Sequence, residues 1–224
     1  MQLLGKIALI TGAKGGLGTF VTQAFLDAGA LVYGASRSIH AEDFGHAGFR
    51  AVPAELTDRA AAEKLAQTPP RIDVAVHLVG AFAGGARIEE SPAGELDKML
   101  DLNLRSAFFF AQAVLPRLRE SRGRFLAVAS RSALEPGERS AAYSLSKAAL
   151  VSLVRTMAAE NRGVSTANVV LPGTMDTPAN RAAMPETDYS TWVDPRQVAS
   201  MLLYLASDQA SHITGAAIPI YGAA

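Results

Sequence analysis

Short apolar runs alternate with helical stripes along most of this chain. Residues 7–10, Ile-Ala-Leu-Ile, form a run without polar alternation, which is typical of a parallel strand covered on both faces. Leu17, Val21 and Phe25 then recur at helical spacing, and Gly29 ends the stripe. The first 29 residues therefore predict a strand, a tight turn and a helix.

The same alternation predicts six further strands and four further helices. The strands are expected at residues 30–35, 49–54, 73–80, 125–129, 165–171 and 216–221. The helices are expected at about 58–67, 95–119, 142–161 and 197–206, the first of them capped by Thr57 or Asp58. No repeat or linker interrupts the alternation. It predicts a single α/β domain over residues 1–224: a Rossmann-type, doubly wound parallel sheet of about seven strands with helices on both faces.

Residues 174–193 break this pattern. The segment has no clear periodicity and contains Pro178 and Pro185. A stretch this long beside a cleft is more often a functional lid than filler. We interpret it as a substrate lid whose Met184, Tyr189 and Trp192 are candidate substrate contacts, with packing inside the lid as the alternative.

Composition narrows the classes of function. The chain has 21 basic and 21 acidic side chains, so no general attraction to nucleic acid or to an anionic membrane is expected. It has no cysteine, which excludes disulfides and thiolate metal sites, and we expect no metal. The N-terminus does not resemble a signal peptide and no apolar run is long enough to span a bilayer, so we expect a soluble cytoplasmic protein.

A glycine-rich turn joins the first predicted strand to the first predicted helix. It has glycines at Gly12, Gly16 and Gly18, the spacing Gly-x-x-x-Gly-x-Gly. In this context backbone N–H groups and a helix N-terminus can hold the pyrophosphate of a dinucleotide. The alternative is a turn that only closes a βα unit; the flanking elements favour a nucleotide site.

The end of the second predicted strand bears on which dinucleotide is bound. An acidic residue there would bind the free 2′-hydroxyl of NAD, whereas this chain has Ser36 followed by Arg37. An arginine suits a 2′-phosphate, and Lys14 in the glycine turn adds a second positive charge. The sequence therefore favours NADP, with NAD as the other possibility if Arg37 is only a solvated loop charge.

Tyr143 and Lys147 are four residues apart in the helix expected at 142–161, so they share one face. A neighbouring ammonium favours the phenolate: at about 4 Å and an effective dielectric of ~20, the attraction could lower the pKa of Tyr143 by up to roughly three pH units. Ser130 follows the strand expected at 125–129 and can hydrogen-bond a carbonyl that Tyr143 protonates. The alternative is that the pair merely lies on a helix surface.

These residues, in this order and spacing, resemble the short-chain dehydrogenase/reductase family over essentially the whole chain. Asn103, Ser130, Tyr143 and Lys147 match its catalytic tetrad. The resemblance implies NAD(P)-dependent hydride transfer between nicotinamide and a carbonyl or alcohol carbon. Tyr143 would be the general acid/base, Ser130 would orient the oxygen, and Lys147 would lower the phenol pKa and bind the nicotinamide ribose. Asn103 would hold a water that links Lys147 to solvent.

The resemblance also implies a set of cofactor contacts and an assembly. The implied contacts are Gly12, Lys14, Gly16, Leu17, Gly18, Ser36, Arg37, Glu55, Leu56, Gly80, Tyr143, Lys147, Pro172, Gly173 and Thr177. Members of the family mostly form homodimers or homotetramers through the two long helices. This chain departs from the family pattern at His77, where an asparagine is usual, and at Glu55, where an aspartate is usual. His77 either substitutes for that asparagine in supporting the strand that holds Asn103 or is an ordinary core histidine, and we favour the core histidine.

A narrower similarity concerns the lid. Residues 176–181 and 184–192 resemble the corresponding part of dihydropteridine reductase, as does the loop with Gly84 and Gly85. That enzyme generally lacks the catalytic serine and prefers NADH, so Ser130 and Arg37 disagree with it. Reduction of a quinonoid dihydropterin is therefore the runner-up. A non-catalytic NADP-sensing regulator is an alternative of another class, which the complete Ser-Tyr-Lys set disfavours.

Overall fold

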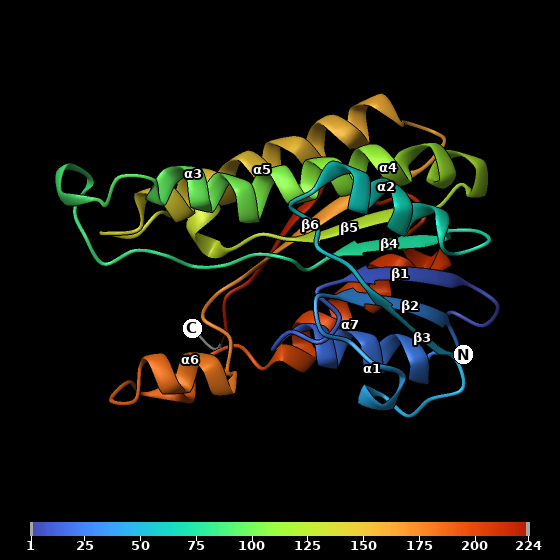
Figure 1. Ribbon diagram of the computed structural model, residues 1–224, viewed down its shortest axis with the longest axis horizontal. Coiled ribbons are helices and arrows are strands. Elements are labelled where there is room, and N and C mark those ends of the chain that lie inside the picture. Colours follow the sequence, from blue (N-terminus) through green and yellow to red (C-terminus); the bar gives the residue numbers. More distant parts are fainter. Residues whose placement is uncertain (1, 223–224) are drawn as a thin grey trace.

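The computed structural model describes residues 2–222 and is built on one seven-stranded sheet (Figure 1). The strand order is β3-β2-β1-β4-β5-β6-β7, and all neighbouring strands are parallel. The strands are β1 (Ile7–Thr11), β2 (Leu31–Ser36), β3 (Phe49–Pro53), β4 (Val74–His77), β5 (Arg124–Val128), β6 (Thr166–Pro172) and β7 (Ala217–Ile220). The order reverses at β1, so the predicted Rossmann-type doubly wound sheet is confirmed.

Helices cover both faces of this sheet (Figure 1). They are α1 (Gly18–Asp27), α2 (Arg59–Gln67), α3 (Glu95–Leu100), α4 (Ser106–Ser121), α5 (Ala141–Glu160), α6 (Pro178–Ala183) and α7 (Pro195–Ala206). Helices α1 and α7 pack together on one face, and α2 and α4 pack together on the other, next to α5. Of the helices within residues 2–222, none combines the length and apolarity needed to cross a membrane.

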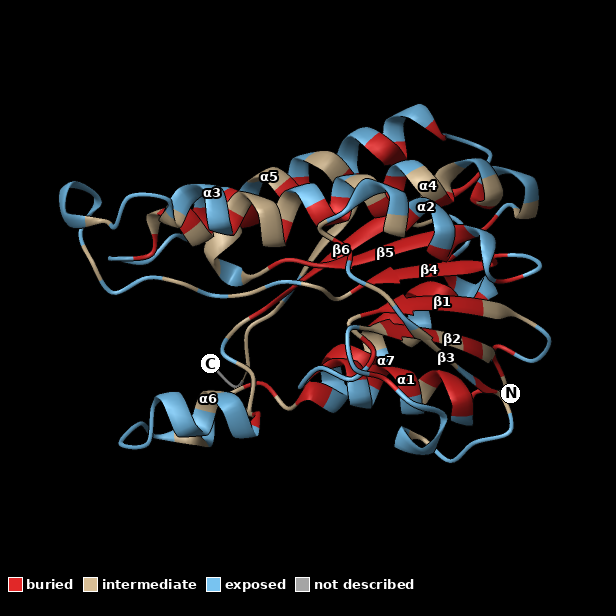
Figure 2. Ribbon diagram, viewed as in Figure 1, coloured by how far each residue is buried: buried red, intermediate tan, exposed pale blue. Residues whose placement is uncertain are grey.

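Each face of the sheet has its own apolar core. One core includes Phe25 of α1 and Leu202 of α7, packed against apolar side chains of β1 and β4. The other includes Phe110 of α4, Leu150 of α5 and Phe125 of β5. Figure 2 shows β4 and β5, in the middle of the sheet, buried along their whole length. Continuous apolar strands follow from this arrangement, because both faces of a parallel sheet are covered.

The predicted helix at 95–119 differs in one respect from the structure. Helix α3 passes into a π-helical turn, Asp101–Arg105, before α4 continues to Ser121. Asn103 lies in this turn and is fully buried. A π turn inserts one residue into a helix and is frequent at functional sites. The other predicted elements appear within a few residues of their expected ends; Asp58 caps α2 by accepting from Ala60 N and Ala61 N.

The segment expected to be irregular contains two short helical pieces. Helix α6 starts after Thr177, whose hydroxyl accepts a hydrogen bond from Asn180 N at 3.3 Å. A 3₁₀ turn, Tyr189–Thr191, follows, and Met175 bridges Val193 where the segment returns to the body of the protein. Figure 1 shows α6 standing away from the sheet. Its role as a lid remains a prediction.

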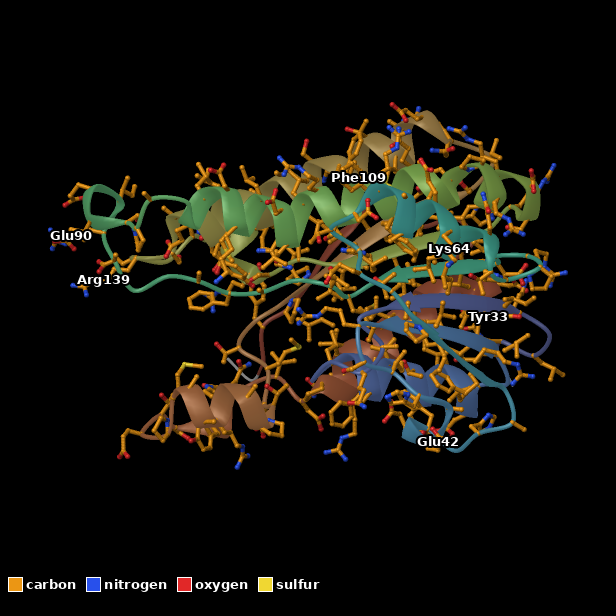
Figure 3. The ribbon with its side chains drawn as sticks, viewed as in Figure 1. Tyr33, Glu42, Lys64, Glu90, Phe109 and Arg139 are labelled. Carbon is orange, nitrogen blue, oxygen red and sulfur yellow. The ribbon has the colours of Figure 1, made fainter. Side chains whose placement is uncertain are left out.

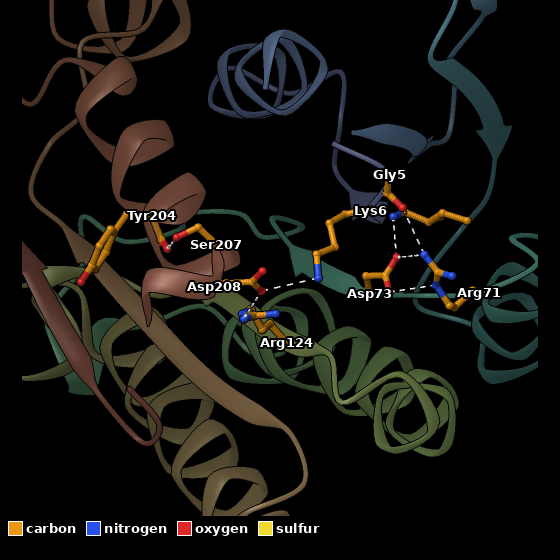
Figure 4. A network of polar contacts seen from close by, with 9 residues as sticks. Gly5, Lys6, Arg71, Asp73, Arg124, Tyr204, Ser207 and Asp208 are labelled. Atoms are coloured by element: carbon orange, nitrogen blue, oxygen red, sulfur yellow. Dashed lines mark hydrogen bonds and ion pairs between the residues drawn. The ribbon is translucent and has the colours of Figure 1, made fainter. Parts of the chain in front are cut away.

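An ion-pair network closes the end of the sheet where the strands begin (Figure 4). Asp208 lies 2.9 Å from the Arg124 guanidinium and 3.5 Å from Lys6 Nζ. Nearby, the Asp73 carboxylate accepts from Ile7 N at 2.7 Å and pairs with Arg71 at 2.9 Å. These contacts tie the N-terminal edge together and leave the opposite, C-terminal edge of the strands as the place for a ligand crevice.

Candidate active site

The C-terminal ends of the central strands lie along one side of the sheet. β1 leads into Gly12, β5 into Ser130, and β6 into Gly173, while helix α5 starts beside them. The C-terminal ends of parallel strands in a doubly wound fold meet at the ligand crevice. Residues that the sequence separates by more than a hundred positions are therefore brought to one edge.

Helix α5 carries the two candidate catalytic side chains. Tyr143 and Lys147 are one turn apart, and Lys147 Nζ lies 5.9 Å from the centroid of the Tyr143 ring. Lys147 is 5% exposed and donates a hydrogen bond from Nζ to Val128 O at 3.2 Å. Within residues 2–222, no carboxylate lies within ion-pair distance of this ammonium. The ammonium is held against the end of β5, on the side of helix α5 that carries Tyr143.

The pKa of Tyr143 is raised in the structure, whereas the sequence predicted that Lys147 would lower it. Burial raises the pKa of Tyr143 above its ordinary value of 10.0, and a hydrogen bond with Ser130 opposes that rise. Burial also lowers the pKa of Lys147 from 10.5 to about 8. The expectation was wrong for the protein alone because desolvation disfavours both the phenolate and the ammonium. At neutral pH, Tyr143 carries its proton and Lys147 its charge.

Asn103 lies beside this pair, and its side chain forms three hydrogen bonds with Ala81 and Ser146. Its Nδ2 donates to Ala81 O at 3.0 Å and to Ser146 Oγ at 2.9 Å, and its Oδ1 accepts from Ala81 N at 2.8 Å. The resemblance implied that Asn103 holds a water. That role stays a prediction; in this structure the Asn103 side chain fixes the loop after β4 to helix α5.

The glycine turn packs closely, as a dinucleotide site requires. Gly12 has φ +72°, and a Cβ built there would lie 3.0 Å from the backbone of Leu78. A Cβ built at Gly16 would lie 3.4 Å from Thr177 Cγ2, so the turn faces that threonine. Leu17 is the N-cap residue of α1, whose first turn has no acidic residue. The positive end of this helix points to the crevice, so these residues fit a pyrophosphate.

The candidate adenine-ribose end also comes together. Lys14 N donates to Ser36 Oγ at 3.2 Å, which joins the glycine turn to the end of β2. Arg37 is exposed and lies 4.0 Å from Glu55, and Leu56 next to it is buried. Lys14 Nζ forms a 2.8 Å ion pair with Asp43. The sequence did not single out Asp43, because no motif contains it.

His77 is buried at the sheet's switch point, as the interpretation of a core histidine requires. Its Nδ1 lies 3.0 Å from Thr11 Oγ1, and its Nε2 lies 3.4 Å from Ser106 Oγ. Burial, helped by the charge of Lys147, lowers its pKa from 6.5 to about 3. His77 is therefore a neutral hydrogen-bonding link between β1 and α4.

Phe82 is a site residue that the sequence analysis missed. Its ring meets the Tyr143 ring edge to face with centroids 5.0 Å apart, and it is 67% exposed. The loop that holds it is fixed where Gly85 N donates to Arg139 O at 2.7 Å. Figure 3 shows Arg139 and Glu90 at the outer end of this region. An exposed aromatic in a glycine-rich loop gives no periodic signal, so only the fold reveals the contact.

The three candidate substrate residues of the lid contact one another. The Tyr189 and Trp192 rings are 4.6 Å apart, and Tyr189 Oη donates to Met184 O at 3.2 Å. Arg181 lies over the Tyr189 ring at 4.5 Å. These contacts form an aromatic unit within the lid, and its contact with a substrate remains a prediction.

Comparisons with known proteins agree with this geometry. A family model described as Enoyl-(Acyl carrier protein) reductase matches residues 12–222. The chain is 32% identical to a rhamnolipids biosynthesis 3-oxoacyl-(acyl-carrier-protein) reductase of Pseudomonas aeruginosa, over 99% of this chain and 96% of that protein. It is 30% identical to a 3-oxoacyl-(acyl-carrier-protein) reductase of Thermotoga maritima, over 99% and 98% of the two chains.

Solved structures give the same answer for the fold. The Pseudomonas aeruginosa RhlG/NADP active-site complex superposes with a TM-score of 0.90 at 31% identity, covering 99% of this chain and 96% of that one. A short-chain dehydrogenase/reductase from Serratia marcescens superposes with a TM-score of 0.91 at 29% identity, covering 99% and 98%. The chain therefore belongs to the short-chain dehydrogenase/reductase family and is an NAD(P)-dependent oxidoreductase.

Proposed function

We propose that this chain reduces a carbonyl group, or oxidises the corresponding alcohol, with Tyr143 as the proton donor and acceptor. The observation that carries the proposal is the pair on helix α5, where the buried ammonium of Lys147 lies 5.9 Å from the centroid of the Tyr143 ring. A proton donor must carry its proton at working pH, and burial keeps the phenol protonated in the free protein.

Each side chain has a role at a stated atom. Tyr143 Oη gives its proton to the substrate oxygen, and Ser130 Oγ holds that oxygen by a hydrogen bond. Lys147 stabilises the phenolate that remains, and its ammonium is free to bind the nicotinamide ribose. Asn103 keeps the loop at Ala81 in place. A bound nicotinamide supplies or accepts the hydride.

The cofactor we propose is NADP(H). The glycine turn with Gly12, Gly16 and Gly18 would hold the pyrophosphate, and Pro172, Gly173 and Thr177 would lie at the nicotinamide end. Lys14, Ser36 and Arg37 meet at the end of β2 with two positive charges that suit a 2′-phosphate. The relative whose structure is described as a RhlG/NADP complex supports this choice. A larger thermal stabilisation by NADPH than by NADH is expected.

The substrate class we propose is a carbonyl compound with an apolar neighbour group. Phe82 offers an exposed apolar surface beside the Tyr143 ring. Because two relatives are described as 3-oxoacyl-(acyl-carrier-protein) reductases, a 3-oxoacyl thioester is the first substrate to test. Closure of the segment at 174–193 over the substrate would bring Met184, Tyr189 and Trp192 near it.

We propose that the protein works as a homodimer or homotetramer in the cytoplasm. Helices α4 and α5 present the exposed apolar side chains of Phe108 and Leu145, which are 48% and 59% exposed. Burying such side chains between copies would remove apolar surface from water. Light scattering of the purified protein measures the assembly directly.

The decisive experiment replaces the phenol oxygen alone. Tyr143→Phe is expected to keep the affinity for NADPH and to lower turnover about a hundredfold or more, as removal of a general acid does. Cofactor affinity is measured by fluorescence titration and turnover by NADPH oxidation. Turnover that survives in Tyr143→Phe removes this residue from the role.

Reduction of a quinonoid dihydropterin is a second candidate, favoured by one observation. Phe82 contacts Tyr143 edge to face and is largely exposed, so it offers a ring surface beside the site on which a planar heterocycle can stack. Competing quinonoid dihydropterin against 3-oxoacyl thioesters and simple ketones, with NADPH and with NADH, separates the two functions. Cofactor binding without turnover of any of these substrates would favour the sensing regulator instead.

A further inference from the structure

Lys14 and Asp43 form the tightest ion pair at the adenine-ribose end of the site. Lys14 belongs to the glycine turn, and Asp43 ends a 3₁₀ turn, Ala41–Asp43, in the connection between β2 and β3. Lys14 Nζ lies 2.8 Å from Asp43 Oδ1, and the two side chains are 40% and 21% exposed. The hydrogen bond with Lys14 is the main reason that the pKa of Asp43 is lowered, so the carboxylate is charged at neutral pH.

The carboxylate of Asp43 is held in this position by its own turn. Its second oxygen, Oδ2, accepts a hydrogen bond from His40 N at 2.8 Å. This contact orients Asp43 toward the glycine turn whether or not Lys14 stays with it. The acidic side chain is therefore a fixed part of the site rather than a freely moving surface charge.

The second cation of the site is held much less firmly. Arg37 lies 4.0 Å from Glu55, and the two side chains are 83% and 52% exposed. Exposed ion pairs of this kind contribute little, so Arg37 is available to a ligand. Lys14 is the cation whose charge is already offset by a carboxylate when a further anion arrives.

The competing anion would arrive at this same point. Lys14 N donates to Ser36 Oγ, so the glycine turn and the end of β2 meet where the adenine ribose is expected. NADP carries a phosphate on the 2′ oxygen of that ribose, whereas NAD carries a hydroxyl. The phosphate and the Asp43 carboxylate are both anions that require the one ammonium of Lys14.

We propose that Asp43 is a specificity-determining residue for the cofactor: it competes with the 2′-phosphate for Lys14 and so weakens NADP(H) binding relative to NAD(H). This inference rests on the proposed function, because it assumes that the dinucleotide binds at the glycine turn. The Asp43 carboxylate makes the preference for NADP smaller than the preference that Lys14 and Arg37 would give without it. The chain is then able to use both cofactors.

Asp43→Asn tests the proposal with a side chain of the same shape. The asparagine oxygen still accepts from His40 N, so the turn is retained while the charge is lost. We expect the Kd for NADPH, measured by fluorescence titration at low ionic strength, to fall about fivefold, and the Kd for NADH to stay unchanged. Glu42→Gln is the matched control: Glu42 is the adjacent acid on the same turn (Figure 3), and its loss should leave the NADPH affinity unchanged.

Removing the ammonium distinguishes competition from general repulsion. In a Lys14→Gln background, Asp43→Asn should give little further gain in NADPH affinity. An undiminished gain there, or a gain of the same size from Glu42→Gln, would overturn competition for Lys14. Unchanged NADPH affinity in Asp43→Asn overturns the proposal while leaving the proposed function standing. Failure of the wild-type protein to bind either NADPH or NADH would instead remove the proposed function, and this inference with it.

Discussion

The ring of Phe82 meets the ring of Tyr143 edge to face, with 5.0 Å between the centroids, and remains 67% exposed. Such a large apolar side chain costs free energy in water unless a ligand covers it. The contact with Tyr143 puts this surface next to the proposed proton donor. Phe82 is thus positioned to contact the group attached to the carbonyl carbon of the proposed substrate.

Phe82→Ala is expected to change substrate choice more than chemistry. The variant should lose about three- to tenfold in kcat/KM for aryl ketones, because an aromatic contact contributes about 0.5–1.5 kcal/mol. Its kcat/KM for small aliphatic ketones should change by less than about twofold. Phe20→Ala, which removes an exposed phenylalanine of helix α1, is the control. Equal losses for both classes of ketone would contradict a role of Phe82 in specificity.

Lys147 should make cofactor binding depend on pH. Burial lowers its pKa from 10.5 to about 8, so the ammonium loses its charge as the pH rises through about 8 in the free protein. If the ammonium binds the nicotinamide ribose, the Kd for NADH should rise above that pH and be flat below it. NADH is the suitable probe because it lacks the 2′-phosphate.

The same titration in Lys147→Met provides the comparison for that prediction. This variant should bind NADH more weakly at neutral pH and show a flat profile from there into the alkaline range. A wild-type profile that is flat over the same range would contradict the assignment. Thermal melts at each pH show whether either protein has begun to unfold.

Gly80 has no room for a side chain because two site residues converge on it. A Cβ built there would lie 2.7 Å from Asn103 Oδ1 and 3.0 Å from Lys147 Nζ. Gly80→Ala should therefore push these groups apart and destabilise the fold by about 1–3 kcal/mol, with a larger fall in kcat than in cofactor affinity. Urea unfolding and steady-state kinetics measure both effects.

Gly137→Ala is the matched change for Gly80→Ala. A Cβ at Gly137 would have Ser140 Oγ as its nearest neighbour, at 4.0 Å. We expect its unfolding free energy and its kcat to stay near those of the wild type. If Gly80→Ala is equally harmless, Asn103 and Lys147 are not held against this backbone as the structure has them.

The sheet and its order of elements could be predicted because burial on both faces leaves a clear trace in the sequence. The apolar run at 7–10 became β1, and the run at 125–129 became β5, each within one residue of its expected bounds. The π turn at Asp101–Arg105 could not be predicted in this way. It coincides with the hydrogen bonds between Asn103 and Ala81, which join residues 22 positions apart.

In the candidate site, too, contacts within one helix could be predicted from the sequence and contacts between loops could not. Tyr143 and Lys147 share a helix, so their spacing alone brings them together. Phe82 and Asp43 lie in loops, and tertiary contacts with Tyr143 and Lys14 bring them to the site. The direction of the pKa shift of Tyr143 could not be predicted from the spacing of Tyr143 and Lys147 either. Burial is the main cause of that shift, and burial depends on the whole fold.

His77 should make the stability of the fold fall in acid. Burial lowers its pKa to about 3, whereas the unfolded chain takes up a proton near the ordinary value of 6.5. Between these pH values the unfolded state binds more protons than the folded state. The contribution of His77 to the free energy of unfolding is therefore fully present above about pH 6.5 and is lost as the pH falls toward 3. From about pH 7.5 to about pH 5, protonation of the unfolded state should remove about 2 kcal/mol through this one group.

His77→Asn removes this titration and keeps a polar side chain between Thr11 and Ser106. At about pH 7.5 the variant should be less stable than the wild type, because the shorter side chain cannot reach both hydroxyls that lie 3.0 and 3.4 Å from the imidazole. At about pH 5 the difference should shrink by about 2 kcal/mol, since only the wild type loses stability through residue 77. Urea unfolding at the two pH values measures the change, and a difference that stays constant would mean that His77 is protonated in the folded protein.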